Sequence, residues 1–336
     1  NYFITGGTGF IGTHLSSLLH EVHRETRIYN LDIVEPGTPL PTVKNYKPAL
    51  GNGEEHAATF IYCDVRQPIE LEKVNITPDD VIFNFAAVHR TPGHPDPAYF
   101  ETNIRGAENV CAFAERHGIR KIVFTSSIAP YGAAEELKEE TTLPMPNTPY
   151  GISKLVAEKI HQTWQAGGEG RQLTIVRPGV VFGRGENGNF TRLYWGIRGH
   201  KFMYPGRKDT IKACIYVKEL VRFMLYRLEH HDSGVELYNC CYEPAYTIEH
   251  IVESMKRVTN MKVKVPFMPG WLIMTAAGIA GALGSPMGIC PARVRKLQIS
   301  TNICGKKLSA SGYRFRYTFE EALADWYKDN GNLYLQ

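Results

Sequence analysis

The sequence predicts an α/β fold: a doubly wound parallel sheet followed by a smaller C-terminal α/β unit. Three observations support this prediction. Short runs of β-branched and aromatic residues alternate with longer segments of helical periodicity through the first half of the 336 residues. A glycine turn joins the first run to the first helical segment. Small or polar side chains follow several runs, as in sheets that bind ligands at their carboxyl edge.

The elements of the first half can be placed from these patterns. We expect strands at residues 2–5, 27–33, 59–65, 80–87 and 121–127, and helices at 13–22, 97–117 and 150–166. The apolar face of the second helix is formed by Phe100, Ile104, Ala107, Val110 and Ala114. Residues 34–59 mix proline, glycine and charges, which indicates a loop.

The glycine turn reads Gly6-Gly7-Thr8-Gly9-Phe10-Ile11-Gly12. Gly6 permits a sharp turn, Gly9 lets the backbone approach a pyrophosphate, and Gly12 lets the helix pack closely on the strand. The helix N-terminus offers unpaired N–H groups and a partial positive charge to phosphates. Because the turn follows a strand, opens a helix and precedes Asp32 by about 20 residues, it predicts dinucleotide binding.

Two aspartates at strand ends bear on the identity of the dinucleotide. Asp32 ends the second strand, where a carboxylate accepts hydrogen bonds from the adenosine ribose and repels a 2′-phosphate. Because Ile33 and Val34 follow it rather than an arginine, the sequence favours NAD over NADP. Asp64 ends the third strand and is a candidate either to contact the adenine or to cap the next segment.

A candidate catalytic group follows the fifth strand. Tyr150 and Lys154 lie four residues apart and therefore share one helix face. Because an ammonium group stabilises a phenolate, we expect Lys154 to lower the pKa of Tyr150 and so make it a base. The same lysine can bind the nicotinamide ribose. Ser127, at the end of the fifth strand, can hydrogen-bond the reacting oxygen.

Composition excludes some classes of partner. Lysine and arginine number 38 against 34 aspartates and glutamates, spread along the chain, so nothing indicates nucleic-acid binding. The seven cysteines include no CxxC pair, which suits unpaired thiols in a reducing compartment, and no metal site is expected. Because the first residues already have a strand pattern, we expect no signal peptide and a cytoplasmic location.

One stretch, residues 266–292, contains no charged side chain. It is long enough to span a membrane, which takes about 20 apolar residues. It also contains four prolines, namely Pro266, Pro269, Pro286 and Pro291, and many glycines. We therefore favour a short buried or surface-docking helix over a true span, with peripheral membrane contact as an expectation.

Together these motifs resemble the extended short-chain dehydrogenases/reductases, within them the sugar-nucleotide epimerases and dehydratases. The matching stretches cover nearly the whole chain: 5–12, 64–65, 84–87, 103, 125–127, 131–132, 150–154, 177–179, 215–220 and 312–313. The resemblance implies an NAD-binding Rossmann domain at 1–176, rejoined by segments at about 210–240, and a mostly substrate-binding domain at 177–336. It also implies a homodimer through the helices at 97–117 and 150–166.

The motifs and the resemblance together give the expected site residues. The catalytic residues are Ser127, Tyr150 and Lys154. The cofactor-binding residues are Gly6, Gly9, Phe10, Ile11, Gly12, Asp32, Asp64, Val65, Phe85, Ala86, Ala87, Asn103, Thr125, Tyr150, Lys154, Arg177 and Pro178. The substrate-binding residues are His89, Arg90, Ser127, Asn189, Phe190, Lys212 and Arg293. Arginine is more usual in the family where Lys212 stands, and a lysine neutralises phosphate without bidentate geometry.

Two departures from the family pattern narrow the reaction. The dehydratases carry an Asp-Glu pair directly after the Ser/Thr, whereas this chain has Ile128-Ala129 there. Eliminating water needs an acid and a base beyond the tyrosine, so 4,6-dehydration is disfavoured. Val180 stands after Arg177-Pro178-Gly179, where epimerases often have asparagine, which puts one substrate contact in doubt.

The resulting interpretation is an NAD-dependent epimerase of a nucleotide-activated sugar, acting at C4 through a transient 4-keto intermediate. One alternative is a dehydrogenase or ketoreductase of the same fold, acting on a sugar nucleotide or a sterol-like substrate. Residues 266–292 favour that alternative, because they suit a lipid-like substrate. A second alternative is a non-catalytic NAD-sensing protein, although such proteins usually lose the tyrosine or the lysine of the pair.

Overall fold

The computed structural model describes residues 1–37, 58–89, 93–232, 234–272, 275 and 298–336. Its centre is a seven-stranded parallel sheet with the order β12-β7-β5-β4-β1-β2-β3. These strands are β1 (Tyr2–Thr5), β2 (Ile28–Asp32), β3 (Thr59–Tyr62), β4 (Val81–Asn84), β5 (Lys121–Thr125), β7 (Gln172–Pro178) and β12 (Val235–Cys240). The doubly wound parallel sheet expected from the sequence is therefore confirmed.

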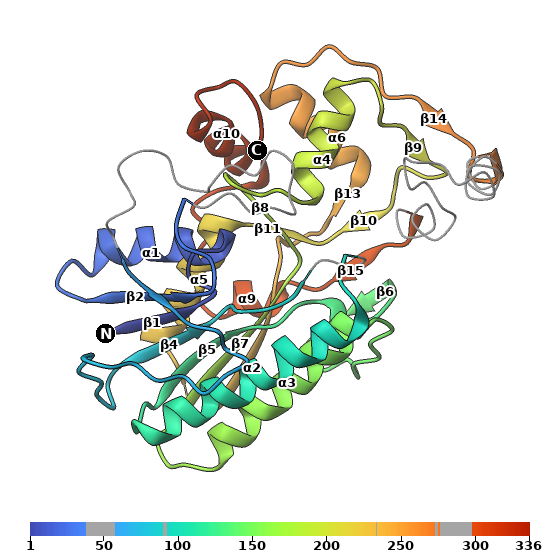
Figure 1. Cartoon of the computed structure of the whole chain (residues 1–336). Helices are drawn as coiled ribbons and strands as arrows, with labels where there is room; N and C mark the ends of the chain where they lie inside the picture. The colour runs from blue at the N-terminus through green and yellow to red at the C-terminus, as the bar shows by residue number, and fades with distance from the viewer. Residues whose placement is uncertain (38–57, 90–92, 233, 273–274, 276–297) are drawn as a thin grey trace.

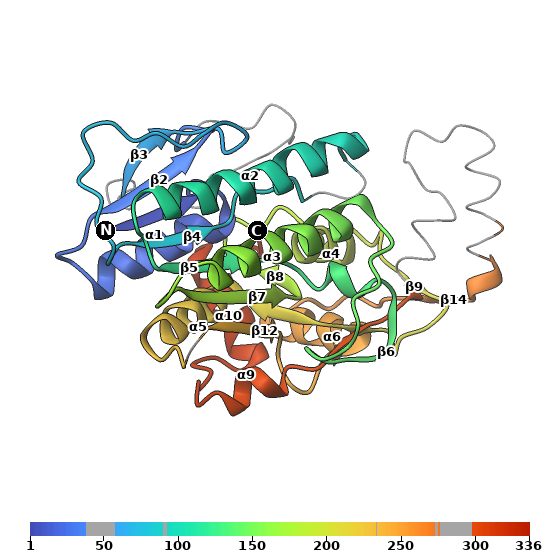
Figure 2. The same ribbon diagram turned by 90° about the horizontal axis from the view of Figure 1, so that it is seen from below.

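Helices cover both faces of this sheet (Figures 1 and 2). Alternate strand residues point to opposite faces, so Tyr2 and Ile4 pack toward one core while Phe3 packs toward the other. The first core is completed by α1 (Phe10–Val22), α5 (Val217–Glu229) and α9 (Lys306–Ala310). The second is completed by α2 (Asp96–Arg116) and α3 (Pro149–Ala166). Burial on both faces explains why the inner strands β1, β4 and β5 are mostly apolar.

A smaller lobe lies beyond the carboxyl edge of the sheet (Figure 1). Its four-stranded sheet has the order β13-β10-β15-β6, formed by β13 (Tyr246–Thr247), β10 (Ile211–Lys212), β15 (Thr301–Ile303) and β6 (Ala134–Lys138). Two short pairs accompany it: β8 (Val180–Phe182) with β11 (Cys214–Tyr216), and β9 (Tyr204–Pro205) with β14 (Phe267–Met268). The helices of this lobe are α4 (Asn189–Arg198), α6 (Ile248–Val258) and α10 (Phe319–Asp329).

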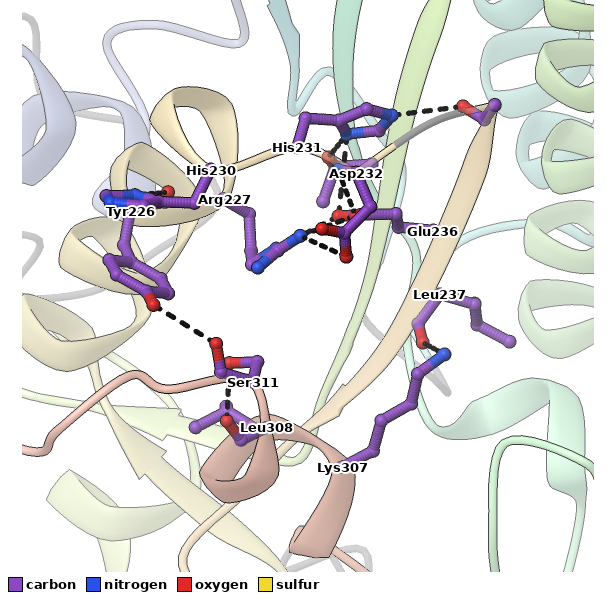
Figure 3. A network of polar contacts seen from close by, with 12 residues as sticks. Tyr226, Arg227, His230, His231, Asp232, Glu236, Leu237, Lys307, Leu308 and Ser311 are labelled. Carbon is purple, nitrogen blue, oxygen red and sulfur yellow. Dashed lines mark hydrogen bonds and ion pairs between the residues drawn. The ribbon is translucent and has the colours of Figure 1, made fainter.

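A buried ion pair joins the last turn of α5 to the start of β12 (Figure 3). Arg227 donates to both carboxylate oxygens of Glu236, at 3.0 Å and 2.5 Å. The aromatic rings of Tyr226 and Tyr238 flank the guanidinium, and His231 lies 3.4 Å from the same carboxylate. This network ties α5 and His231 to the first residues of β12, at the edge of the sheet opposite the carboxyl ends.

Several expected boundaries shift by a few residues. α1 begins at Phe10 rather than residue 13, because the extended Gly9 is already its N-cap. β5 ends at Thr125, so Ser126 and Ser127 belong to the loop that follows it. All six cysteines in the described residues are unpaired. No helix within those residues has both the length and the apolar character to cross a membrane, and most of 266–292 lies outside them.

Candidate active site

The glycine turn lies where the strand order reverses, between the neighbours β1 and β4. Gly6 has a φ of +69°, and a Cβ there would lie 2.8 Å from the backbone nitrogen of Ala86. A Cβ on Gly12 would lie 2.6 Å from the carbonyl oxygen of Gly7, so only glycine lets α1 begin against the turn. The first N–H groups of α1 have no partner within the helix, as at any helix start. No side chain at the N-cap Gly9 accepts from them either, so they suit an anion.

Asp32 stands beside this turn at the end of β2. Its carboxylate accepts backbone hydrogen bonds from Ile33 at 2.8 Å and from Thr8 at 3.2 Å. The Thr8 hydroxyl in turn donates to the carbonyl of Val34. These bonds fix the carboxylate at the rim of the turn, which is the position expected of a group that binds an adenosine ribose.

The segments after β4 and β5 complete a surface suited to a dinucleotide. Phe85, Ala86 and Ala87 are partly exposed, and the first two lie against Gly6. The hydroxyl of Thr125 is buried, and no residue in the described part of the chain hydrogen-bonds it. An unsatisfied buried hydroxyl, an uncapped helix terminus and crowded glycines all fit a bound NAD.

Tyr150 and Ser127 come together in front of this surface. Thr148 caps α3 by accepting from the N–H of Gly151, and a Cβ on Gly151 would meet the carbonyl of Ala129 at 2.7 Å. The helix start thus packs tightly on the short 3-10 helix η1 (Ala129–Tyr131), which Ile128 separates from Ser127. Burial raises the pKa of Tyr150, while a hydrogen bond with Ser127 acts in the opposite direction.

Lys154 lies one turn further along α3 and is 2% exposed. Its ammonium lies 4.5 Å from the centre of the Phe124 ring. Burial lowers the pKa of Lys154 to about 7, although the charge of Glu158 acts to raise it. The expected lowering of the tyrosine pKa by Lys154 does not appear. The physical reason is that burial disfavours both the phenolate and the ammonium.

Glu158 is a positioning residue that the sequence interpretation missed. It accepts from Arg177 at 2.8 Å and 2.6 Å and from the hydroxyl of Ser126 at 2.5 Å. The guanidinium of Arg177 also lies 4.7 Å from the Tyr131 ring centre. This network joins α3 to the ends of β5 and β7. A charged residue four positions after Lys154, on the same buried helix face, was the available signal.

His161 lies about two helical turns after Lys154 on α3 and is buried like Lys154 and Glu158. Its ring stacks on Phe124 with centroids 4.1 Å apart. One ring nitrogen lies 2.7 Å from the carbonyl of Ala157, and the other is 3.1 Å from the amide nitrogen of Asn84. Because burial lowers the pKa of His161 to about 4, the ring is neutral and accepts from Asn84. The Phe124 ring thus has two contacts: it stacks on the His161 ring and it lies next to the Lys154 ammonium.

Several residues expected to bind the cofactor are engaged within the protein. Asn103 is buried, accepts from the N–H of Val88 and donates to Ser153, so its side chain shapes the loop after β4. Asp64 makes a two-oxygen ion pair with Arg66, which lowers the pKa of Asp64. Val65 packs against Gly106 of α2. Pro178 ends β7, where its carbonyl accepts from Ile128.

The expected substrate residues are more scattered. His89 is exposed on the loop after β4. Lys212, on β10, donates to the carbonyl of Ile299 at 2.7 Å. Asn189 begins α4, whereas the Phe190 side chain is buried and stacks on Phe182 in the core of the smaller lobe. Arg90 and Arg293 lie outside the described residues.

Comparison with known proteins decides the family. The model of the NAD dependent epimerase/dehydratase family matches residues 2–241. The chain belongs to this family. It is therefore an NAD-dependent enzyme of the extended short-chain dehydrogenase/reductase type, as its glycine turn and its Tyr150–Lys154 pair predicted.

The relatives include epimerases named for sugars on two kinds of carrier, an undecaprenol diphosphate and UDP. The N-acetyl-alpha-D-glucosaminyl-diphospho-ditrans,octacis-undecaprenol 4-epimerase of Escherichia coli O157:H7 is 30% identical over 329 residues, which cover 96% of this chain and 93% of the relative. A UDP-N-acetylglucosamine 4-epimerase from Methanobrevibacter ruminantium M1 has a similar structure, with a TM-score of 0.74 and 21% identity over 99% of this chain and 98% of that one. A UDP-glucuronic acid 4-epimerase from Bacillus cereus, in complex with NAD, also superposes with a TM-score of 0.74, at 18% identity over 99% and 97% of the two chains.

Proposed function

We propose that this protein is an NAD-dependent 4-epimerase of sugars carried on a diphosphate, with nucleotide sugars as substrates. The observation that carries the proposal is the position of Tyr150 beside Ser127 and one helical turn before Lys154. Beside it, Ile128 and Ala129 leave no second acid or base of the kind a dehydratase uses. The names of the relatives above support the position of the reaction on the sugar.

The reaction needs a proton acceptor and a hydride acceptor at the same carbon. When bound, NAD⁺ would supply reversible hydride transfer at that carbon, with the glycine turn, Asp32 and Lys154 holding it. Tyr150 as a phenolate takes the proton of the C4 hydroxyl, the C4–H bond breaks, and a C4 carbonyl forms. Ser127 hydrogen-bonds that oxygen. After the 4-keto sugar turns over, the hydride reaches its other face and Tyr150 returns the proton, so no net oxidation occurs.

The other expected residues take supporting roles in this proposal. Asp32 binds the adenosine ribose, and the uncapped start of α1 binds the pyrophosphate. Lys154 binds the nicotinamide ribose and, when charged, favours the phenolate. The substrate contacts assigned to Lys212, His89, Arg90 and Arg293 belong to the same proposal, and the last two residues lie outside the described part of the chain. The division into a cofactor domain at 1–176 and a substrate domain at 177–336 is part of the same proposal.

A homodimer in a reducing compartment completes the proposal. α2 and α3 pack side by side on the outer face of the sheet (Figure 2), and Ile152 and Val156 of α3 remain exposed. Two such surfaces could pair as a four-helix bundle. Light scattering should give twice the chain mass for the wild type and the single-chain mass for Ile152→Lys. A wild type that remains a monomer at high concentration would contradict the dimer.

Cofactor stoichiometry separates the epimerase from the dehydrogenase of the same fold. The purified protein with its bound NAD should convert UDP-N-acetylglucosamine to a mixture of C4 epimers without added cofactor. Absorbance at the NADH wavelength should not increase during turnover. One equivalent of NADH per product would instead assign the protein as a dehydrogenase. Retained NAD with no turnover across a panel of sugar nucleotides would favour the non-catalytic alternative.

A further inference from the structure

The smaller lobe carries an apolar tip, formed by Phe267 of β14 and by Trp271 and Leu272 just after it. Their side chains are 52%, 70% and 42% exposed, respectively. Both views place β14 at the end of the lobe, far from α1 (Figures 1 and 2). β14 pairs with β9, and the amide of Leu272 donates to the carbonyl of Pro269, so the backbone of the tip is ordered. Exposed large apolar side chains gathered in one place mark an interaction surface.

The charges next to the tip are basic. Lys201 precedes β9, and Lys262 and Lys264 precede β14; all three are exposed. Within the described part of the chain, none of the three forms an ion pair, whereas the nearby Glu249 and Glu253 are paired with Lys208 and Lys256. In the sequence, the uncharged run 266–292 is also followed at once by Arg293, Arg295 and Lys296. Basic groups on both sides of an apolar stretch suit an anionic lipid surface.

A continuous set of contacts links this tip to the candidate active site. η1 leads into β6, β6 pairs with β15, and β15 pairs with β10 at Lys212. The ammonium of Lys212 contacts the carbonyl of Ile299. Its neighbour Gln298 lies against Gly206 and Gly270, where an added Cβ would stand 3.0 Å and 3.1 Å from the Gln298 amide nitrogen. Gly270 immediately precedes Trp271. The small sheet thus lies between the segment that follows Ser127, which enters it at β6, and Gln298, which contacts the base of the tip at Gly270.

We propose that Phe267, Trp271 and Leu272 dock this enzyme on an anionic membrane, so that glycosyl diphosphates held there by a polyprenyl chain reach the active site. The inference rests on the proposed 4-epimerase activity and extends its substrates from nucleotide carriers to lipid carriers. The E. coli relative, named for an undecaprenyl-linked substrate, supports it. A second copy of the chain is a poorer occupant, because the lysines around the tip would repel their copies.

Vesicle binding tests the docking step. Wild-type protein should sediment with vesicles of phosphatidylglycerol and phosphatidylcholine, much less with phosphatidylcholine alone, and should be released by high salt. The double variant Phe267→Ser/Trp271→Ser should lose about tenfold or more in partitioning. Trp195→Ser, at another exposed tryptophan on α4, is the matched control and should bind as the wild type does. The proposal is overturned if wild type stays in solution, or if the double variant binds equally well.

The turnover rates of a lipid-linked and a UDP-linked substrate distinguish this inference from the proposed function. The wild type should epimerise N-acetylglucosaminyl-diphospho-undecaprenol in phosphatidylglycerol vesicles, and the double variant should lose most of that rate. Its rate with soluble UDP-N-acetylglucosamine should be unchanged, since the tip lies outside the catalytic group. If only the soluble substrate is converted, the inference about the membrane is overturned, whereas the proposed epimerase activity is retained. If neither substrate is converted, the proposed function itself fails. Tip variants that change the oligomeric mass, with no vesicle binding by wild type, would assign the tip to a self-contact.

Discussion

Two buried cations at opposite edges of the central sheet are held in different ways. At the edge away from the active site, Arg227 is paired with Glu236, and this pairing raises the pKa of Arg227 although burial alone would lower it (Figure 3). At the carboxyl edge, Lys154 faces an aromatic ring and its pKa falls to about 7. The first cation is therefore paired with a carboxylate of the protein, whereas burial without a directly paired carboxylate disfavours the charge of the second. Functional sites commonly carry such perturbed groups.

The largest expected effect is on catalysis at the carboxyl edge. Tyr150→Phe removes the proton acceptor and should lower turnover by about 10²–10⁴-fold, the usual contribution of a general base. NAD should remain bound, because the phenol is not its main anchor. Tyr238→Phe is the matched control, since it removes a hydroxyl beside Arg227. Full turnover by Tyr150→Phe would exclude the assigned base.

At the other edge, the expected loss is of stability rather than of activity. Arg227→Met leaves the Glu236 carboxylate buried without its main partner, which should cost about 3–5 kcal/mol of unfolding free energy in urea titrations. The double variant Arg227→Met/Glu236→Leu should regain most of that loss, because it buries no lone charge. Folded protein should keep its specific activity. A double variant as unstable as the single one would show that the pair is not the cause.

A smaller and opposite effect is expected for Lys154→Met in NAD-free protein. Below pH 7, both the folded and the unfolded chain hold this proton, so the full cost of the buried charge is present. Between pH 7 and 10.5, the unfolded chain binds more protons than the folded one, so this lysine makes stability rise with pH. Lys154→Met should therefore stabilise the protein by up to a few kcal/mol at pH 6 and by less at pH 9.

Exposed Lys159, on the same helix, gives the control for this pH dependence. Lys159→Met should leave the unfolding free energy nearly unchanged at both values. An equal stability gain at pH 6 and pH 9 for Lys154→Met would show that a titrating charge is not involved. Turnover by Lys154→Met should fall, so stability and activity would change in opposite directions, as expected of a strained site.

Local patterns predicted the elements of the sheet better than they predicted the contacts of the site. The turn at Gly6 and Gly12 could be recognised from the sequence. Each close backbone contact there requires a glycine, so the glycines recur at a characteristic spacing. The pairing of β6 with β15 could not, since the two are far apart in the chain and their pairing depends on the whole fold.

The pKa shifts and the ion-pair partners of the site could not be predicted from the sequence either. The spacing of Tyr150 and Lys154 correctly indicated one helix face, but the direction of the tyrosine pKa depends on burial that no motif records. The same holds for Arg177: the resemblance to the family singled it out, but neither the strand that carries it nor its pairing with Glu158 on α3 was predicted. Roles assigned to Asn189, Phe190 and Lys212 stay predictions.

The central claim is that the C4 hydrogen leaves the sugar as a hydride and returns to the same carbon. Its most direct test is epimerisation of UDP-N-acetylglucosamine deuterated at C4, followed by NMR or mass spectrometry of the product. Tyr150 exchanges only the hydroxyl proton, so the product should retain the deuterium at C4 in ordinary water, and an unlabelled substrate should gain none in D₂O. Loss of the label to solvent would contradict the account, because the carbon would then be deprotonated rather than oxidised.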